Sequence, residues 1–513
     1  MSGAQLPPGI ASWPRGLWTM GRQLRVNALR FPNKTALADR SRKLSYRTLN
    51  ESVNRLAHGF LERGVAKGDH VALLYGNTIE HVVALYAAAK IGAVSVVLDA
   101  KWIAREIAQA LEFFDCTFLV YDRAHEAQLP AAPPPRLAFD ESDAAWLAAR
   151  PAGEPAVEVD DDDVFLLMLT SGTTGLPKGC IKTHLSYAHS NALASASQHM
   201  DEESSELIVV PIYYNSGRVS LINMLSLGGT AHLRERLDPE EALATIERER
   251  ITCLALAPTQ CNELLAFPRL DAYDKSSLRS LRKAGLPFPA RAVKEIMERI
   301  CPFLYQGFGG TEFSSAALLH PGEQLTKLGS AGRPLAGMEV EIVDDDKRPL
   351  PPGERGEVRV RGPSVCSGYY KNEEANRATF IDGWYHSGDL GYLDAEGYLY
   401  IVGRKKDLVK TGGINVAPRE VEEAILSLAE VADVAVIGVA DERWGEMLKA
   451  LVVAKPGAVL TVDLVRERCG ERLARYKIPK AIDIVERIPR SPLGKVTADV
   501  KAAIASSAPG RDA

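Results

Sequence analysis

The stretch Leu169-Thr-Ser-Gly-Thr-Thr-Gly-Leu-Pro-Lys178 is the segment from which this sequence is best interpreted. It follows Val164-Phe-Leu-Leu-Met168, an apolar run that predicts a buried strand. Glycines let backbone N–H groups approach phosphate oxygens, hydroxyl side chains add donors, and the lysine adds positive charge. The GxxxxGK[ST] spacing of the common P-loop is absent. The stretch therefore predicts a polyphosphate-binding loop, with an ordinary surface loop as the alternative.

Size and composition restrict the class of protein. The 513 residues exceed what one hydrophobic core supports, so we expect two or more domains. With 61 basic and 66 acidic residues the net charge is −5, which gives no reason to expect nucleic acid as a partner. No apolar run reaches transmembrane length, and we recognise no secretory leader. The seven cysteines are scattered without a CxxC pair, which favours free thiols in the cytoplasm.

The first part of the chain alternates strand and helix patterns. Apolar runs at residues 71–75 and 94–98 predict strands, and helical spacing lies between them at residues 79–91. This βαβ order predicts a parallel sheet covered by helices. Residues 126–163 are rich in Pro, Ala and acidic side chains, so we expect a surface connection there.

The pattern changes near residue 330. Residues 340–343 and 356–361, separated by an acidic turn, predict antiparallel β-structure. From about residue 404 the alternation of short helices and strands predicts a small α+β unit. We place the domain boundary at residues 403–407, where a charged run suits a solvated hinge.

Four further segments share their order with the motifs of one known superfamily. They are Gln306-Gly-Phe-Gly-Gly-Thr-Glu312, Gly383-Trp-Tyr-His-Ser-Gly-Asp389, Gly403-Arg-Lys-Lys-Asp-Leu-Val-Lys-Thr-Gly-Gly-Ile-Asn415 and Pro489-Arg-Ser-Pro-Leu-Gly-Lys495. Together with the phosphate loop, they resemble the adenylate-forming superfamily: acyl-CoA synthetases (AMP-dependent acid–CoA ligases), adenylation domains of nonribosomal peptide synthetases, and luciferases. The resemblance covers about residues 25–500, nearly the whole chain.

The resemblance implies a fold and a reaction. The implied fold is α/β, with a large N-terminal domain of α/β subdomains plus a distorted β-barrel, and a small, mobile α+β C-terminal domain. Residues 1–403 would bind AMP and the acyl group, and residues 404–513 would carry the catalytic lysine. The reaction would use ATP and Mg²⁺ to turn a carboxylic acid into an acyl-adenylate. A thiol, usually that of coenzyme A, would then take the acyl group and release AMP.

By the same resemblance, the nucleotide-binding residues are assigned one by one. Those that would hold the β- and γ-phosphates are Thr170, Ser171, Gly172, Thr173, Thr174, Gly175 and Lys178. Thr311 would contact the α-phosphate, and Glu312 would bind Mg²⁺. Phe308 and Gly309 would contact the adenine. Asp389 and Arg404 would contact the ribose. In isolation, an acid such as Glu312 or Asp389 is more often a surface or turn residue; the ordered set favours function.

The C-terminal residues are assigned in the same way. Lys495 would reach the substrate carboxylate and the α-phosphate during adenylation, because an ammonium is a mobile point charge. Lys406 stands at the hinge position of the family. Lys410 stands where some members place a second lysine, and Gly412 and Gly413 stand where the pantetheine arm passes.

Several positions depart from the family pattern and bear on the acid. Tyr214 stands at the usual histidine of the Pro-x-x-His-x-x-Gly segment, and Gly310 stands where a larger apolar residue is common. Leu286 would wall the substrate site. Arg218 could pair with a second carboxylate on the acid, although we favour a side chain that points outward. Lys283 replaces a small residue, and nothing in the sequence explains it.

Three functions remain open at this point. The first is an AMP-forming acid–CoA ligase for a medium-sized or aromatic acid. The second is a stand-alone adenylation enzyme that loads the phosphopantetheine thiol of a carrier protein; no carrier module follows Lys495, so free coenzyme A is the simpler acceptor. The third is a nucleotide-binding relative without activity. We expect a cytoplasmic protein, and the sequence allows a homo-oligomer.

Overall fold

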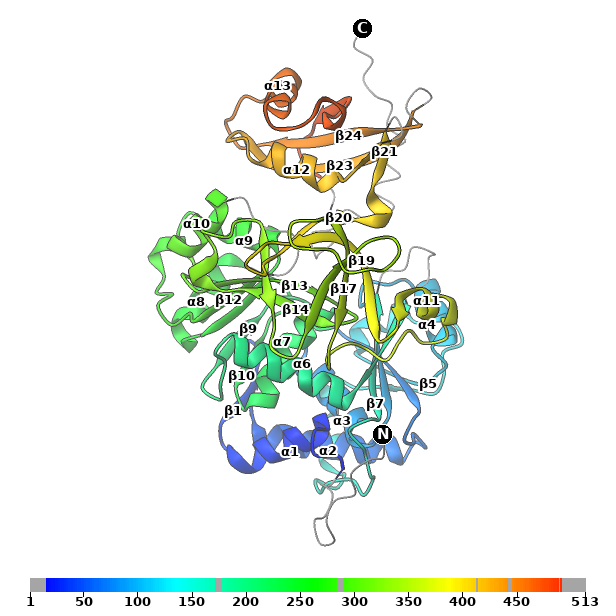
Figure 1. Ribbon diagram of the computed structural model, residues 1–513. Coiled ribbons are helices and arrows are strands. Elements are labelled where there is room, and N and C mark those ends of the chain that lie inside the picture. Colours follow the sequence, from blue (N-terminus) through cyan, green and yellow to red (C-terminus); the bar gives the residue numbers. More distant parts are fainter. Residues whose placement is uncertain are drawn as a thin grey trace, which may run out of the picture.

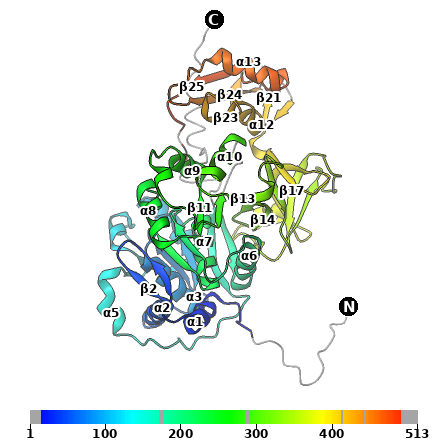
Figure 2. The ribbon, with the colours of Figure 1, turned by 90° about the vertical axis from the view of Figure 1, so that its left-hand side faces the viewer.

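The computed structural model describes residues 15–170, 178–283, 290–411, 414–441, 445–488 and 490. The chain forms a large body built on two sheets and a small domain built on a third (Figures 1 and 2). The small domain, orange in Figure 1, lies beyond the end of β20 (Leu399–Arg404). This arrangement is the α/β fold with a large N-terminal and a small C-terminal part that the sequence predicts.

A six-stranded sheet carries the predicted phosphate loop. Its strands, in spatial order, are β6 (Arg136–Ala138), β5 (Cys116–Tyr121), β3 (His70–Leu74), β4 (Val94–Val97), β7 (Val164–Thr170) and β8 (Lys178–Thr183). All neighbours are parallel except β7 and β8, which form an antiparallel hairpin around residues 171–177. The predicted βαβ unit is therefore present, with α3 (Ile79–Lys90) as its crossover.

A fourteen-stranded sheet changes from parallel to antiparallel along its length. Its parallel half consists of β1 (Thr35–Ala38), β10 (Thr230–Leu233), β9 (Ser205–Ile208), β11 (Cys253–Leu256), β12 (Ser280–Lys283) and β13 (Leu304–Gly310), with β2 (Lys43–Ser45) antiparallel at the edge. Its antiparallel half consists of β14 (Ser314–Leu319), β15 (Ser330–Pro334), β20, β19 (Trp384–Leu393), β17 (Gly356–Arg361) and β16 (Glu339–Val343), with β18 (Phe380–Ile381) on β19.

Helices fill the space between and around these two sheets. Those of the large body are α1 (Met20–Arg30), α2 (Tyr46–Leu61), α3, α4 (Ala104–Phe113), α5 (Ala144–Ala148), α6 (His184–Ser197), α7 (Asn215–Leu227), α8 (Pro239–Glu249), α9 (Pro258–Leu265), α10 (Ala290–Arg299) and α11 (Glu373–Thr379). All twelve residues of α3 are buried, and one core joins α3, α6 and α7 to both sheets. A helix that is buried on every side is apolar all round, which explains the run at residues 79–91.

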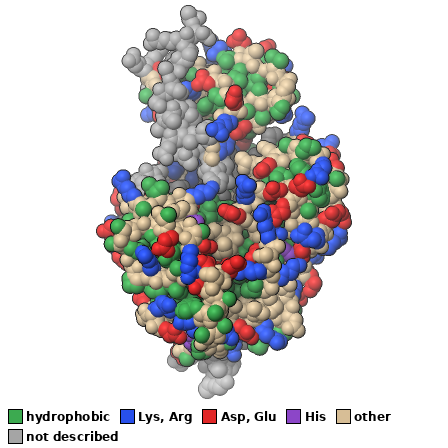
Figure 3. All heavy atoms as spheres, turned by 180° about the vertical axis from the view of Figure 1, so that it is seen from behind, with side chains coloured by type: hydrophobic (Ala, Val, Ile, Leu, Met, Phe, Trp, Pro, Cys, Tyr) green, Lys and Arg blue, Asp and Glu red, His purple; other side chains and the backbone are tan. Residues whose placement is uncertain are grey.

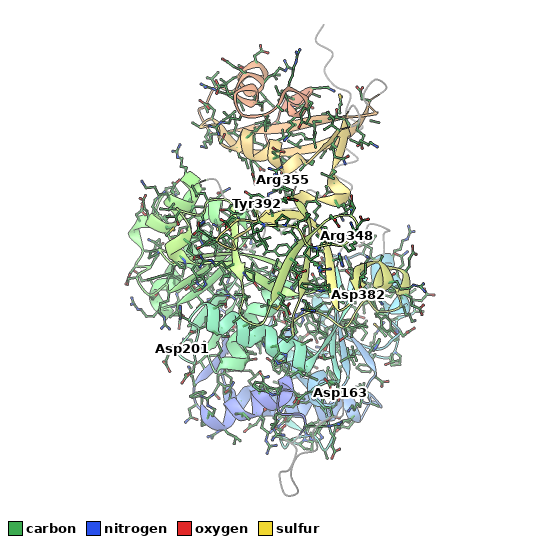
Figure 4. The ribbon with its side chains drawn as sticks, viewed as in Figure 1. Asp163, Asp201, Arg348, Arg355, Asp382 and Tyr392 are labelled. Carbon is green, nitrogen blue, oxygen red and sulfur yellow. The ribbon has the colours of Figure 1, made fainter. Side chains whose placement is uncertain are left out.

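The small domain is an α+β unit with its own core. Its strands and helices are β22 (Ile414–Val416), β21 (Val409–Thr411), β24 (Gly445–Ala454), β23 (Val431–Asp441), β25 (Ala481–Ile484), α12 (Pro418–Leu426) and α13 (Val462–Arg472). Arg355 and Tyr392 lie at the end of the large body that faces this domain (Figure 4). Tyr392 stacks on Tyr400 with ring centroids 4.9 Å apart.

Two expectations about local structure need correction. Residues 126–163 are more than a surface connection, because they supply strand β6 to the sheet and the short helix α5. The Gln306 motif was expected to follow a strand at residues 303–305, but most of the motif lies inside that strand, β13. Antiparallel pairing with the next strand, β14, extends this glycine-containing segment, which overrides its weak strand propensity.

The outer surface shows mixed charge. Seen from behind, Lys, Arg, Asp and Glu side chains are interspersed over the large body (Figure 3). Within the described ranges, no helix combines the length and apolar character needed to cross a lipid bilayer.

Candidate active site

The predicted phosphate loop is the tip of the β7–β8 hairpin. Thr170 and Lys178 are paired across its open end. The ammonium of Lys178 lies 4.6 Å from the centre of the Tyr369 ring, which is a cation–π contact. Residues 171–177, and with them Ser171, Gly172, Thr173, Thr174 and Gly175, lie outside the described residues, as does the side chain of Thr170. The structure therefore defines the base of the loop and the lysine at its end.

A segment at residues 366–370 extends this hairpin. The N–H of Ile181 donates to the carbonyl of Gly368 at 2.9 Å, and the N–H of Tyr370 donates to the carbonyl of Gly179 at 2.8 Å. The segment places Tyr369 beside the end of the loop. The sequence motifs gave no indication of this contact, because it joins residues nearly 200 positions apart.

Glu312 lies at the same place. The hydroxyl of Tyr369 donates to its Oε1 at 2.8 Å, while no described residue bonds its Oε2. Burial, and after it the negative charge of Glu312, raise the pKa of the Tyr369 hydroxyl, which stays a proton donor. One carboxylate oxygen of Glu312 thus remains available to a cation. A carboxylate next to a phosphate loop suits Mg²⁺, which takes oxygen ligands from protein and phosphates together.

A buried lysine hydrogen bonds the backbone of Glu312. Lys182, on β8, is 0% exposed and donates to the carbonyl oxygens of Glu312 at 2.9 Å and Ser364 at 2.6 Å. Burial lowers its pKa. The N–H of Cys366 donates to the same Glu312 carbonyl at 2.7 Å. The backbone that carries Glu312 is therefore fixed by two donors, and sequence analysis missed both.

Asp389 and Arg404 form a cross-strand pair. They are opposite one another on β19 and β20, and Nε of Arg404 donates to Oδ1 of Asp389 at 2.8 Å. Burial alone would lower the pKa of Arg404, but the Asp389 carboxylate raises it overall. The structure therefore joins the two residues that the sequence assigns to the ribose. Asp389 is buried in a strand, not exposed in a turn.

The aromatic motif residue lies at the end of β13. Phe308 is buried, with its ring centroid 5.0 Å from that of Phe313. Gly309 is exposed, and a Cβ there would lie 2.3 Å from the carbonyl oxygen of Ser314. Only glycine fits this close approach. Gly310 closes the strand, and Thr311 and Glu312 follow in the turn to β14.

The turn before α7 forms the acid side of the predicted site. The hydroxyl of Tyr214 donates to Oδ2 of Asp99 at 2.9 Å, and its ring lies 4.6 Å from that of Tyr213. Burial raises the pKa of Tyr213 to about 12. A Cβ on Gly217 would lie 2.4 Å from the carbonyl oxygen of Pro211. Glycine at the end of the Pro-x-x-x-x-x-Gly segment is thus required for the turn to fold against its own helix.

Arg218 does not point outward, so the favoured interpretation of its orientation is wrong. The residue is 2% exposed, and its Nη1 donates to the carbonyls of Ile212 at 3.1 Å and Tyr213 at 3.2 Å. Its Nε has no partner among the described residues. Burial lowers its pKa, and Tyr187 lies close enough to counter this in part. Arg218 therefore braces the turn that carries Tyr214.

Lys283 is also buried, at the end of β12. Its Nζ lies 3.3 Å from Oε1 of Gln306, its neighbour on β13. Gln306 in turn donates to Gln324, which donates to the carbonyls of Leu304 and Leu319 at 3.0 Å. Burial lowers the pKa of Lys283 well below its usual value. The side chain is part of a buried polar chain on the face of the sheet opposite α7.

Two of the remaining assigned residues lie near the start of the small domain, and the other four lie outside the described residues. Lys406 lies in the single turn at Lys405–Asp407 and is exposed, and Lys410 is exposed on β21. Leu286, Gly412, Gly413 and Lys495 lie outside the described residues.

Two family models and several known proteins are similar to this chain. The family model of AMP-binding enzymes matches residues 24–370, and the model of the AMP-binding enzyme C-terminal domain matches residues 420–495. A feruloyl-CoA synthase of Amycolatopsis is 36% identical over 493 residues, covering 95% of this chain and 97% of that protein. An indoleacetate–CoA ligase of Aromatoleum aromaticum is 35% identical over 483 residues, covering 91% and 94%.

A solved structure shows the same architecture with ligands. It is the o-succinylbenzoate coenzyme A synthetase of Bacillus subtilis in complex with ATP and a magnesium ion. Its TM-score is 0.82 at 31% sequence identity, covering 92% of this chain and 97% of that chain. The matches extend over both the large body and the small domain. The chain therefore belongs to the AMP-binding enzyme family and is an adenylate-forming acyl-CoA synthetase.

Proposed function

We propose that this chain activates a carboxylic acid with ATP to an acyl-adenylate and then transfers the acyl group to coenzyme A, with residue roles as follows. The observation that carries these roles is the contact of Lys178, Tyr369 and Glu312 at the end of the hairpin loop. It brings a cation and a carboxylate to the place where a triphosphate and its metal would meet. Mg²⁺, when bound, neutralises triphosphate charge.

The chain's own residues orient the nucleotide. Glu312 holds the cation with its free Oε2, and Lys178 with the loop residues 170–175 holds the β- and γ-phosphates. Thr311 hydrogen bonds the α-phosphate. Asp389 accepts the ribose hydroxyls, because a carboxylate can accept two hydrogen bonds at once. Phe308 and Gly309 line the adenine.

The acid binds beside the Tyr214 turn, with Gly310 and Leu286 next to it. Lys495 neutralises the approaching carboxylate and the α-phosphate, which aligns two anionic groups that repel each other in water. Residues 1–403 and 404–513 act as the two domains, with Lys406 at the hinge. After adenylation, the pantetheine arm of coenzyme A passes Gly412 and Gly413. Lys410 acts in the domain arrangement in which the thioester forms.

Free coenzyme A is the proposed acceptor, ahead of a carrier protein, because relatives that match more than nine tenths of the chain are a feruloyl-CoA synthase and an indoleacetate–CoA ligase by name. The cytoplasm is the proposed compartment. All seven cysteines are free thiols, which suits reducing conditions.

Pyrophosphate exchange tests this proposal. The purified protein would be given ATP, Mg²⁺ and a panel of short, long, aromatic and dicarboxylic acids, and exchange of labelled pyrophosphate into ATP would be measured. At least one acid should support exchange, and free coenzyme A should then yield AMP and a thioester. Exchange with no acid at all would refute the enzyme, and thioester formation only on a carrier protein would refute the acceptor.

A further inference from the structure

A buried ion pair crosses the parallel sheet beneath α7. Arg282, on β12, donates to Oε1 of Glu206, on β9, although β11 lies between those strands. The bridge passes over β11 at Cys253 and Ala255, which are register partners of Ser280 and Arg282 on the same face of the sheet. Small side chains on the intervening strand leave room for the guanidinium to reach across it.

Helix α7 contacts this ion pair. Nη2 of Arg282 also donates to Oγ of Ser220 on that helix, at 3.0 Å. Around the pair, buried polar atoms lack partners among the described residues: Oε2 of Glu206, Nε of Arg282 and Oγ of Ser280. Further such atoms lie on α7, at Ser216 and Asn223, which share a helix face with Ser220. A region this rich in unpaired polar atoms is built to meet water or a polar ligand.

The region is also open. Ala255 and Arg282 lie on central strands of a parallel sheet, yet both are partly exposed, and the Arg282 side chain retains 13% of its surface. Central strands of such sheets are normally closed off by helices on both faces. The remaining terminal nitrogen of Arg282, Nη1, has no hydrogen-bond partner among the described residues. Among the described residues, this donor of the guanidinium is thus left for an acceptor from outside them.

The open region lies in line with the acid side of the site. Helix α7 begins directly after Tyr214 and connects the parallel strands β9 and β10, so it runs back from the carboxyl ends of the strands into the body. Ser220 is six residues beyond Tyr214, about 9 Å along a helix that rises 1.5 Å per residue. This depth suits an aromatic ring on a short linker, whereas a long acyl chain would place apolar carbons against the charged groups of Arg282 and Glu206.

We propose that Arg282, held by Glu206 and Ser220, hydrogen bonds an oxygen at the far end of the acid, and that the enzyme selects a hydroxylated aromatic acid. This inference rests on the proposed function. A neutral hydroxyl fits better than a second carboxylate, because the charge of Arg282 is already matched by Glu206. A second carboxylate would meet the unpaired Oε2 of Glu206, which repels it.

The test compares three acids of one shape: cinnamic acid, 4-hydroxycinnamic acid and 4-carboxycinnamic acid. The measured quantity is kcat/KM for thioester formation with ATP, Mg²⁺ and coenzyme A. The hydroxylated acid should exceed the other two by about tenfold or more, because a site built to hydrogen bond a hydroxyl rejects the analogue without it. Equal turnover of all three, or preference for the carboxylated acid, would overturn the inference but leave the ligase activity intact. Turnover of no acid would instead refute the proposed function.

Substitution of the arginine separates recognition from structure. Arg282→Lys keeps the charge opposite Glu206 but removes the planar fork, so the preference for the hydroxyl should fall to within about threefold while cinnamic acid is still used. Arg359→Lys is the matched control: its side chain is 14% exposed and it pairs with Glu341 across β16 and β17, away from α7. This control should keep the preference.

A double variant guards against misfolding. Arg282→Met with Glu206→Gln removes both charges, so neither is left buried without its partner. Circular dichroism and the midpoint of thermal unfolding would establish that it folds. The folded double variant should also lose the preference for the hydroxyl, and retention of the full preference in both variants would contradict the role of Arg282.

Discussion

The predicted nucleotide side and the predicted acid side of the site are built differently. On the nucleotide side, Tyr369 donates to Glu312, and Lys182 fixes the backbone beneath it through two carbonyls. On the acid side, Arg218 and Arg282 are each held by hydrogen bonds but keep an Nε without a partner among the described residues. On the predicted nucleotide side, the described donors fix the backbone of Glu312 and leave its Oε2 for a cation, while on the predicted acid side the two arginines leave nitrogen donors for another group to satisfy.

Removing the negative charge on the nucleotide side should have the largest effect. Glu312→Gln keeps the acceptor for the Tyr369 hydroxyl but loses the charge that would hold Mg²⁺. We expect pyrophosphate exchange to fall by about a hundredfold or more, with the fold retained. The rate would be measured against magnesium concentration.

Tyr369→Phe is the control for this variant, because it removes the hydrogen bond and leaves the charge. Its loss of exchange should be much smaller than that of Glu312→Gln. If Tyr369→Phe lost as much exchange activity as Glu312→Gln, the hydrogen bond would matter as much as the charge, which would contradict the dominant role given to the charge.

The support beneath Glu312 should matter for stability and activity together. Lys182→Met removes donors to the carbonyls of Glu312 and Ser364, which should cost about 1–3 kcal/mol in the free energy of unfolding. Urea unfolding would measure this cost, and the KM for ATP should rise. The control Lys90→Met alters another buried lysine, which contacts Glu154. It should destabilise the protein without changing the KM, and a parallel rise in KM would weaken the link between Lys182 and the nucleotide.

The burial of His81, on helix α3, should make the free energy of unfolding depend on pH. Burial lowers the pKa of His81 to about 4, and Arg218 adds to the effect, so this histidine is neutral in the folded protein at pH 5. In the unfolded chain its pKa is about 6.5. Between these two pKa values His81 is protonated in the unfolded state and neutral in the folded state. The free energy of unfolding therefore falls as the pH drops from about 6.5 towards 4.

Between pH 7 and pH 5, the loss from His81 should be about 2 kcal/mol. His81→Gln should reduce the decline in the free energy of unfolding by that amount, measured by urea titration at each pH. His58→Gln, near the surface on α2, is the control and should decline like the unaltered protein. If the free energy of unfolding of His81→Gln fell with pH as steeply as that of the unaltered protein, protonation of this histidine would not be the cause of the decline.

The smallest expected effect is at Tyr214. Tyr214→Phe keeps the ring but loses the 2.9 Å hydrogen bond to Asp99, worth about 1 kcal/mol. We expect the KM for the acid to rise about fivefold with the KM for ATP unchanged. A change in the KM for ATP instead would place Tyr214 on the nucleotide side and blur the comparison.

Sequence patterns predicted the parts of the molecule that depend on local order. The helix at α3, its end before Gly92 and the strand β7 follow from apolar spacing and a glycine with φ of 68°. Asp389 and Arg404 were assigned from their motifs, and they lie opposite one another in adjacent strands. Whether they bind the ribose stays a prediction.

What the sequence could not predict depends on contacts between distant segments. Lys182 is one lysine in a short strand, and only the position of residues 312 and 364 makes it a buried support. Tyr369 reaches Glu312 because its segment pairs with β8. Arg218 was expected at the surface because charged residues usually are, but the folded turn supplies carbonyls that receive it.

The central claim is that one cation from the small domain is needed for the first step and not for the second. The most direct measurement is a single-turnover comparison of Lys495→Ala with the unaltered protein, once with acid and ATP and once with a supplied acyl-adenylate and coenzyme A. Adenylation should be lost while thioester formation from the adenylate continues at a comparable rate. Equal loss in both half-reactions, or no loss in either, would contradict the account.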